Sequence, residues 1–169
     1  GKVIESIKNK QTIGLFALGV VTFLVLYGSL ITCLPFLLDK SFGASSLIIG
    51  LIMSSVSFTS AVISTKIGVI TRYISRKTVL IIAFRLYASA LMIIPFVPIL
   101  WGFVAPAIIF GFGLGLAVPS LQSLLMEKAP IKYRAAYMSI NNMVLRVGQT
   151  LGPILMGILL TTSGIEGVF

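Results

Sequence analysis

The stretch from residue 134 to residue 162, RAAYMSINNMVLRVGQTLGPILMGILLTT, decides the fold of this chain. It is apolar and long enough to cross a bilayer as an α-helix, which rises about 1.5 Å per residue. It nevertheless carries Arg146 near its middle. A charge at that depth costs on the order of 3 kcal/mol on insertion scales and is rarely left facing lipid. The stretch therefore predicts a membrane helix with one face hidden from the lipid.

The composition places the whole chain in the same class. Of its 169 residues, 57% are hydrophobic and 10% are charged, whereas soluble domains carry about 25% charged residues. The net charge is +9, but the basic residues lie in short clusters between apolar runs, which argues against nucleic-acid binding. Cys33 is the one cysteine and there is no histidine, so we expect no internal disulfide, no metal site and no cofactor.

Five apolar segments predict an all-α polytopic bundle of five transmembrane helices. They cover residues 13–38, 47–70, 78–97, 99–126 and 134–162. We expect Pro35 to bend the end of the first helix and residues 39–43 to form a polar turn after it. Residues 1–12 are expected to be a polar lead-in on the cytoplasmic side, residues 13–162 the bundle, and residues 163–169 an extracytoplasmic tail.

The basic residues are distributed unevenly between the two sides of this bundle. Among the connectors, one side holds Lys40 alone. The other side holds ten basic residues, namely Lys2, Lys8, Lys10, Lys66, Arg72, Arg76, Lys77, Lys128, Lys132 and Arg134. Because cytoplasmic loops carry an excess of Lys and Arg, we expect this side, and the N-terminus with it, to be cytoplasmic. Arg85 lies within a span, about two turns from Lys77, so its stem can reach back to that surface.

Taken as a helix at about 100° per residue, the opening stretch has two distinct faces. One stripe contains Ser139, Asn142, Arg146, Gln149 and Pro153. Gly148 and Gly152 lie on roughly the opposite face, with Asn141 near them. We expect the polar stripe to face a water-accessible cavity. The glycine face is expected to pack closely against another helix, as small residues do in membranes.

Alternatives stay open for several of these residues. Arg146 either lines the cavity or ties helices together through backbone carbonyls without meeting a solute. Pro153 leaves the carbonyl of Gln149 without its backbone donor, so the helix is expected to bend there. The bend is either part of a motion that changes access to the cavity or a static kink. Tyr27, in the first span, is a weaker candidate for the cavity wall.

The groups that the chain lacks exclude several functions. Asp, Glu and His are absent from the interiors of the predicted spans, so this chain offers no titratable group for a proton relay. It also has no P-loop, no HExxH motif and no nucleophile–base pair, which argues against ATP hydrolysis and membrane proteolysis. We therefore expect no enzyme. A solute transporter and a non-transporting scaffold or pore both remain possible.

Two motifs resemble those of the major facilitator superfamily of secondary transporters. The connector GVITRYISRK, residues 68–77, is similar to motif A of that family, G-x-x-x-D-R-x-G-R-[RK], through Gly68, Arg76 and Lys77. It departs from the motif at Arg72, which stands where the family has Asp, at Tyr73, which stands where it has Arg, and at Ser75, which stands where it has the second Gly. GQTLGPILMG, residues 148–157, is similar to motif C, G-x-x-x-G-P-x-x-G-G, through Gly148, Gly152, Pro153 and Gly157.

The resemblance covers nearly the whole chain and is closest to the C-terminal six-helix half, as a fragment spanning helices 7 to 11. It implies a multi-pass protein of the cytoplasmic membrane that moves a small solute by alternating access. The first expectation is a proton-coupled exporter of drugs or metabolites, whose coupling carboxylates lie in an N-terminal half that this chain lacks. The second is uptake or exchange of a sugar or organic anion.

The resemblance also assigns roles to particular residues. Arg146, Asn142 and Gln149 are expected to line the central cavity, with Tyr27 a weaker candidate. Arg72, Arg76 and Lys77 are expected to latch the cytoplasmic side of the bundle against a helix end or a carboxylate.

Overall fold

The computed structural model of the protein describes residues 9–163, which are helical apart from short connectors. The α-helices are α2 (Lys10–Val25), α3 (Leu34–Phe42), α4 (Ser46–Tyr73), α5 (Arg76–Ile93), α6 (Val104–Lys128) and α7 (Arg134–Ser163). A π-helical segment, Leu26–Cys33, joins α2 to α3. Short 3₁₀ turns cover Ile94–Phe96, Leu100–Phe103 and Ile131–Tyr133.

Five of these helical rods are long and apolar enough to cross a membrane. They are Lys10–Phe42, Ser46–Tyr73, Arg76–Phe96, Leu100–Lys128 and Ile131–Thr162. The prediction of an all-α bundle with five candidate spans is thus confirmed. Residues 1–8 of the expected lead-in and residues 164–169 of the expected tail lie outside the described residues, so the domain boundaries stay predictions.

The first rod departs from a regular α-helix before Pro35, not at it. Leu26–Cys33 is π-helical, and the backbone N–H of Leu34 donates to the carbonyl of Ser29, five residues earlier. Proline has no backbone donor and its ring clashes with the carbonyl four residues before it. We attribute the wider turns to that constraint, because they precede the proline directly.

The same rod also continues further than expected. Of the residues 39–43 that were predicted to form a polar turn, 39–42 instead belong to the last turn of α3. The helix ends at Gly43, which has a left-handed φ of 57° and donates its N–H to the carbonyl of Asp39. A left-handed residue after a helix is usually glycine, since glycine has no Cβ to clash there.

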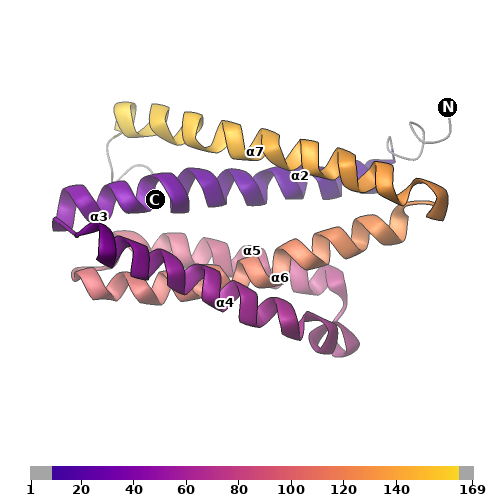
Figure 1. The fold of residues 1–169 in the computed structure, drawn as a ribbon, viewed down its shortest axis with the longest axis horizontal. Helices are drawn as coiled ribbons and strands as arrows, with labels where there is room; N and C mark the ends of the chain where they lie inside the picture. Colours follow the sequence, from indigo (N-terminus) through magenta and orange to yellow (C-terminus); the bar gives the residue numbers. More distant parts are fainter. Residues whose placement is uncertain (1–8, 164–169) are drawn as a thin grey trace.

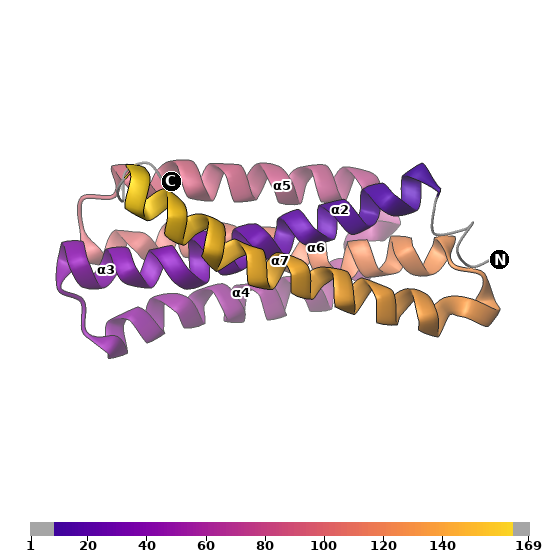
Figure 2. The ribbon, with the colours of Figure 1, turned by 90° about the horizontal axis from the view of Figure 1, so that it is seen from above.

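The helices form two groups that are joined side by side. α6 packs along both α4 and α5, and α7 packs along α2 and the π-helical segment, while α2 meets α6 over a narrower contact. Figure 1 shows α2 and α7 lying next to each other above α4, α5 and α6. Seen from above in Figure 2, α4 and α5 flank the molecule on opposite sides, with α6, α2 and α7 between them.

The described part of the chain buries one apolar core and leaves large apolar side chains outside. Phe110 of α6 and Tyr87 of α5 are buried, with ring centroids 4.6 Å apart. In contrast, Phe58, Met92 and Phe96 are 73%, 68% and 82% exposed. An exterior of this kind suits lipid, which solvates apolar side chains as well as the protein interior does.

Two glycines of α6 allow it to approach α4 closely. A Cβ on Gly111 would lie 2.6 Å from the carbonyl oxygen of Val56, and a Cβ on Gly115 would lie 2.6 Å from that of Ser60. Real Cβ atoms do not approach a backbone oxygen so closely. The two helices could therefore not meet at this distance with any other residue at either position.

α7 meets α2 in the same way. A Cβ on Gly148 would lie 2.5 Å from the carbonyl oxygen of Val20, and one on Gly152 would lie 2.7 Å from that of Leu24. On the opposing rod, a Cβ on Gly28 would lie 2.9 Å from the carbonyl oxygen of Gly152. The glycine face of the opening stretch is therefore covered by α2 and the π-helical segment.

Gly148→Ala tests this contact. The added methyl group can be accommodated only if the α2 backbone moves, so we expect a loss of about 1–3 kcal/mol in stability. Gly50→Ala in α4 is the matched control, because nothing lies within 4 Å of a Cβ there. Unfolding of the purified protein in detergent by a denaturant series measures both. Equal effects of the two substitutions would contradict the close approach of α7 and α2.

Candidate functional site

The polar stripe of α7 points away from the helices to which α7 is attached. Arg146 and Asn142 are exposed, and Gln149 is half-buried, whereas Gly148 and Gly152 on the other face are buried. Within residues 9–163, the guanidinium of Arg146 has no hydrogen bond or ion pair. The packing of the glycine face thus turns Arg146 outward, into space that the described residues do not fill.

The two adjacent asparagines of this helix differ in burial. Asn141 is 3% exposed and lies on the glycine side, while Asn142 is exposed beside Arg146. Pro153, which belongs to the stripe by its spacing, is half-buried, and α7 continues through it to Ser163. The stripe that the described chain offers to a solute therefore centres on Arg146, Asn142 and Gln149.

Tyr27 is placed differently from these three. It lies in the π-helical segment, is half-buried, and its ring stacks on that of Phe23 with centroids 6.0 Å apart. Its carbonyl accepts a hydrogen bond from the hydroxyl of Thr32 at 2.7 Å, five residues on. Nothing in the described contacts brings Tyr27 to Arg146.

The π-helical segment itself was not expected from the sequence. It contains Gly28, which lies against Gly152, and Ser29, whose hydroxyl donates to the sulfur of Met156 at 4.0 Å. π-helical turns are frequent at functional sites. The feature of the sequence that could have indicated this segment is Pro35, which follows Gly28 within the same apolar segment.

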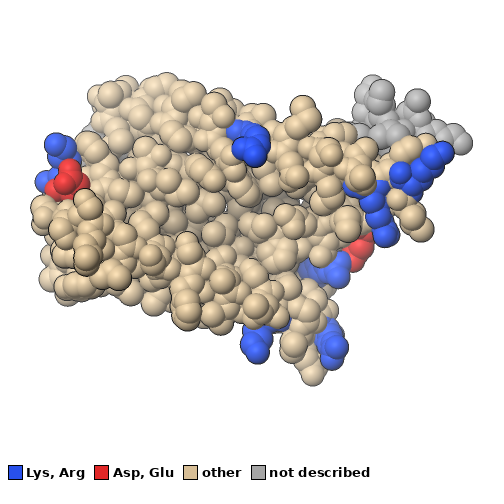
Figure 3. Space-filling model, viewed as in Figure 1, with Lys and Arg blue, Asp and Glu red and all other residues tan. Residues whose placement is uncertain are grey.

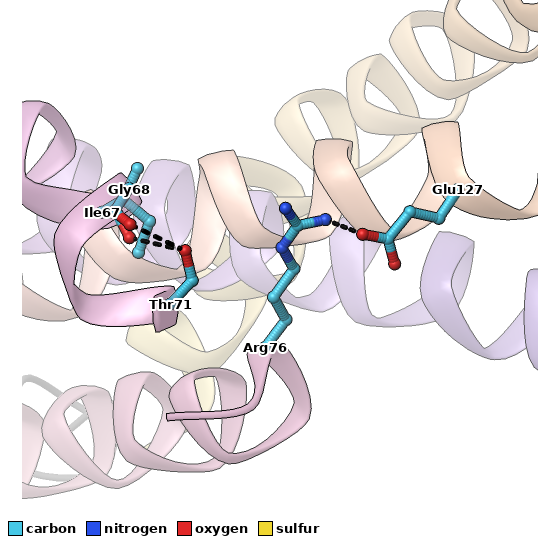
Figure 4. A network of polar contacts seen from close by, with 5 residues as sticks. All are labelled: Ile67, Gly68, Thr71, Arg76 and Glu127. Atoms are coloured by element: carbon cyan, nitrogen blue, oxygen red, sulfur yellow. Dashed lines mark hydrogen bonds and ion pairs between the residues drawn. The ribbon is translucent and has the colours of Figure 1, made fainter. Parts of the chain in front are cut away.

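The motif A-like connector joins α4 to α5 at the basic end of the bundle. Its Arg76 forms an ion pair with Glu127 in the last turn of α6, as Figure 4 shows. Nearby, the hydroxyl of Thr71 donates to the carbonyls of Ile67 and Gly68 at 2.9 and 3.4 Å. The pair fastens the start of α5 to the end of α6. Sequence reasoning did not single out Glu127, although it is the acidic residue of a neighbouring connector on the same side.

Other residues of the two motifs have no such contact. Arg72 and Lys77 are exposed and form no ion pair or side-chain hydrogen bond within residues 9–163. Nothing in the described chain lies within 4 Å of a Cβ on Gly68 or on Gly157, so neither glycine is required there by a close neighbour.

Basic residues gather at the end of the molecule where these connectors lie. Figure 3 shows Lys and Arg side chains concentrated at that end. A groove of about 460 Å³ opens there, lined among others by Arg76, Glu127, Arg134 and Gln122. Lys40 lies in the last turn of α3, at the opposite end of the first rod, beside Asp39.

Comparison with protein families agrees with this architecture. Residues 15–169, which make up most of the chain, match the model of the Major Facilitator Superfamily. The chain belongs to the major facilitator superfamily. It is therefore a multi-pass membrane protein of a superfamily whose members are membrane transporters.

A curated relative of this superfamily member comes from an archaeon. The chain is 26% identical over 155 residues to an uncharacterized MFS-type transporter of Methanocaldococcus jannaschii. The match covers 91% of this chain and 40% of the relative. The chain thus spans less than half the length of that relative.

The Arg76–Glu127 pair makes a modest and salt-dependent contribution that a double-mutant cycle can measure. The two side chains are 34% and 55% exposed. Exposed pairs contribute about 0.2–1 kcal/mol and weaken as salt screens them. We expect a coupling in this range between Arg76→Gln and Glu127→Gln, measured by unfolding in detergent at low and high salt. Arg72→Gln with Glu127→Gln is the control pair and should be additive; coupling of similar size there would deny a specific contact.

Proposed function

We propose that this chain is part of a secondary active transporter that moves a small solute across the membrane by alternating access. Membership of the major facilitator superfamily carries the proposal. We further propose that the chain corresponds to helices 7 to 11, in the C-terminal half, with its N-terminus on the cytoplasmic side. The fragment resemblance and the excess of Lys and Arg at one end of the bundle support this placement.

In this proposal α7 has a different role on each face. Gly148 and Gly152 hold it against α2, so that α2 and α7 move as one body. Arg146, Asn142 and Gln149 then line one wall of a cavity near the bilayer midplane, opposite the N-terminal half. Transporters of this kind bind solute at the interface of their structural repeats, where a buried cation is retained for function.

The charged residues of the predicted spans guide our choice of coupling ion and of solute class. We propose proton-coupled export of a drug or metabolite, with the coupling carboxylates supplied by the other half, since the predicted spans of this chain lack them. Uptake or exchange of an organic anion or a sugar is the alternative. Between these two alternative solutes, the guanidinium of Arg146 favours an organic anion over a sugar, because a cation in a low-dielectric cavity attracts a negative solute.

Solute flux with and without a pH gradient tests the coupling. The natural-length protein is reconstituted into vesicles, and uptake of labelled cationic amphiphiles, organic anions and sugars is followed. A proton-coupled exporter accumulates its solute only while the gradient lasts, and a protonophore abolishes accumulation. Flux that ignores the gradient would rule out proton coupling and leave facilitated exchange.

Arg146→Ala separates a transporter from a scaffold. If Arg146 binds the solute, the substitution should lower flux on the order of a hundredfold, from the loss of a charge-assisted contact of about 3 kcal/mol, and Arg146→Lys should restore part of it. Ile158→Ala, an exposed apolar position of the same helix, is the control and should leave flux unchanged. If Arg146→Ala alters assembly on size-exclusion chromatography but not flux, Arg146 ties helices together instead.

A further inference from the structure

The connector between α5 and α6 carries almost no polar side chain. From Ala90 to Pro119 the sequence contains no charged, amide or hydroxyl side chain, and Trp101 is the one residue of that run whose side chain can donate a hydrogen bond. In contrast, α3 ends on the same side of the bundle, as Figure 1 shows, and carries Asp39 and Lys40 in its last turn. The α5–α6 connector therefore has the composition of a segment that stays in apolar surroundings.

The length of α5 sets the depth of this connector. Arg76 and Lys77 begin α5 at the basic end of the bundle, where charged heads require water or lipid headgroups. The rod then runs to Phe96 over 21 residues, which is about 31 Å at 1.5 Å per residue. The hydrocarbon layer of a bilayer is about 30 Å thick. The α5 rod therefore ends at the far boundary of that layer, whereas the first rod, with 33 residues, is long enough to reach beyond it.

The backbone of the connector forms hydrogen bonds within the connector itself. Pro95 and Pro98 have no N–H that would need an acceptor. The N–H groups of Val97 and Gly102 donate to carbonyls three residues earlier, at 3.3 and 3.0 Å. A Cβ on Gly102 would lie 2.7 Å from the side chain of Val97, so the two turns fold onto each other. Because backbone groups without a partner are costly next to lipid, this pairing allows the connector to remain close to acyl chains.

A buried ring at the end of the connector holds it against α3 and leaves other apolar side chains outside. Phe103 is 1% exposed, and its ring meets that of Phe42 edge-on with centroids 5.2 Å apart. Phe96, Ile99 and Trp101 are instead 82%, 64% and 57% exposed. An indole has an apolar body and a single polar N–H, which suits the boundary between acyl chains and headgroups.

We propose that the α5–α6 connector is embedded in the lipid boundary on the side away from the basic end. In this position Phe96 and Ile99 lie against acyl chains and Trp101 lies at headgroup level. The length of α5, the apolar composition and the internal pairing of the backbone each support this depth, and none of them depends on what else the complete protein contains. In water, the connector would expose large apolar side chains at a cost that grows with their area. The proposal rests on the membrane location of the bundle, not on its solute.

Fluorescence quenching tests this depth without measuring transport. The natural-length protein, with its own cysteines replaced by serine, receives one cysteine as Ile99→Cys or, for the control, as Ser41→Cys at the exposed end of α3. Each cysteine is labelled with bimane, and the protein is reconstituted into phosphatidylcholine vesicles. We expect lipid that carries a nitroxide near its headgroup to quench the label at Ile99 several-fold more strongly than aqueous iodide does. The label at Ser41 should show the opposite order.

A second labelling site guards the result against a local effect of the label. Phe96→Cys is the most exposed position of the connector, and it should give the same order of quenching in a protein that stays monodisperse on size-exclusion chromatography. The proposal is overturned if iodide quenches both connector labels as strongly as the label at Ser41, because the connector then lies in water. It is also overturned if neither quencher reaches them, because another polypeptide segment then covers the connector.

Discussion

The arrangement of the helices depends on backbone contact at two interfaces lined by glycine. In a bilayer the hydrophobic effect does not drive helices together, so association relies on close packing and on contacts between backbones. Gly111 and Gly115 bring α6 onto α4, and Gly148 and Gly152 bring α7 onto α2. In each pair the glycines are four residues apart and meet carbonyl oxygens four residues apart, at hypothetical Cβ distances of 2.5 to 2.7 Å. The same packing solution is thus used twice, and the narrower contact of α2 with α6 joins the two groups.

This constraint also fixes the direction of the charge in α7. A helix whose glycine face lies against a neighbour cannot rotate without moving side chains or backbone into that neighbour. Arg146 is on the opposite face. The packing of Gly148 and Gly152 against α2 therefore keeps Arg146 pointing outward, although Arg146 itself does not contact α2. Two helices held together in this way can move as one body, which the proposed rigid-body rocking requires.

Charged side chains are shared unequally between the groove beside Arg76 and a second groove, which α2, α5 and α6 line and which contains Lys77, Arg85 and Lys128. One groove contains Arg76, Arg134 and Glu127, and the ion pair there fastens α5 to α6. The other contains cations without a carboxylate. The difference arises because Glu127 faces Arg76 across the α5–α6 contact, which leaves Lys77 on the far side of the same connector. Adjacent residues of one motif therefore meet different surroundings.

The sequence by itself determined the number of spans and their approximate limits, because length and apolar composition decide whether a helix can cross a bilayer. Helical periodicity placed Arg146 and Gly148 on opposite faces for the same local reason. Only the tertiary structure decided that α2 covers the glycine face and that Glu127 pairs with Arg76. These features depend on contacts between segments far apart in the chain, or on how one helix accommodates its neighbours. No local pattern of residue types contains that information.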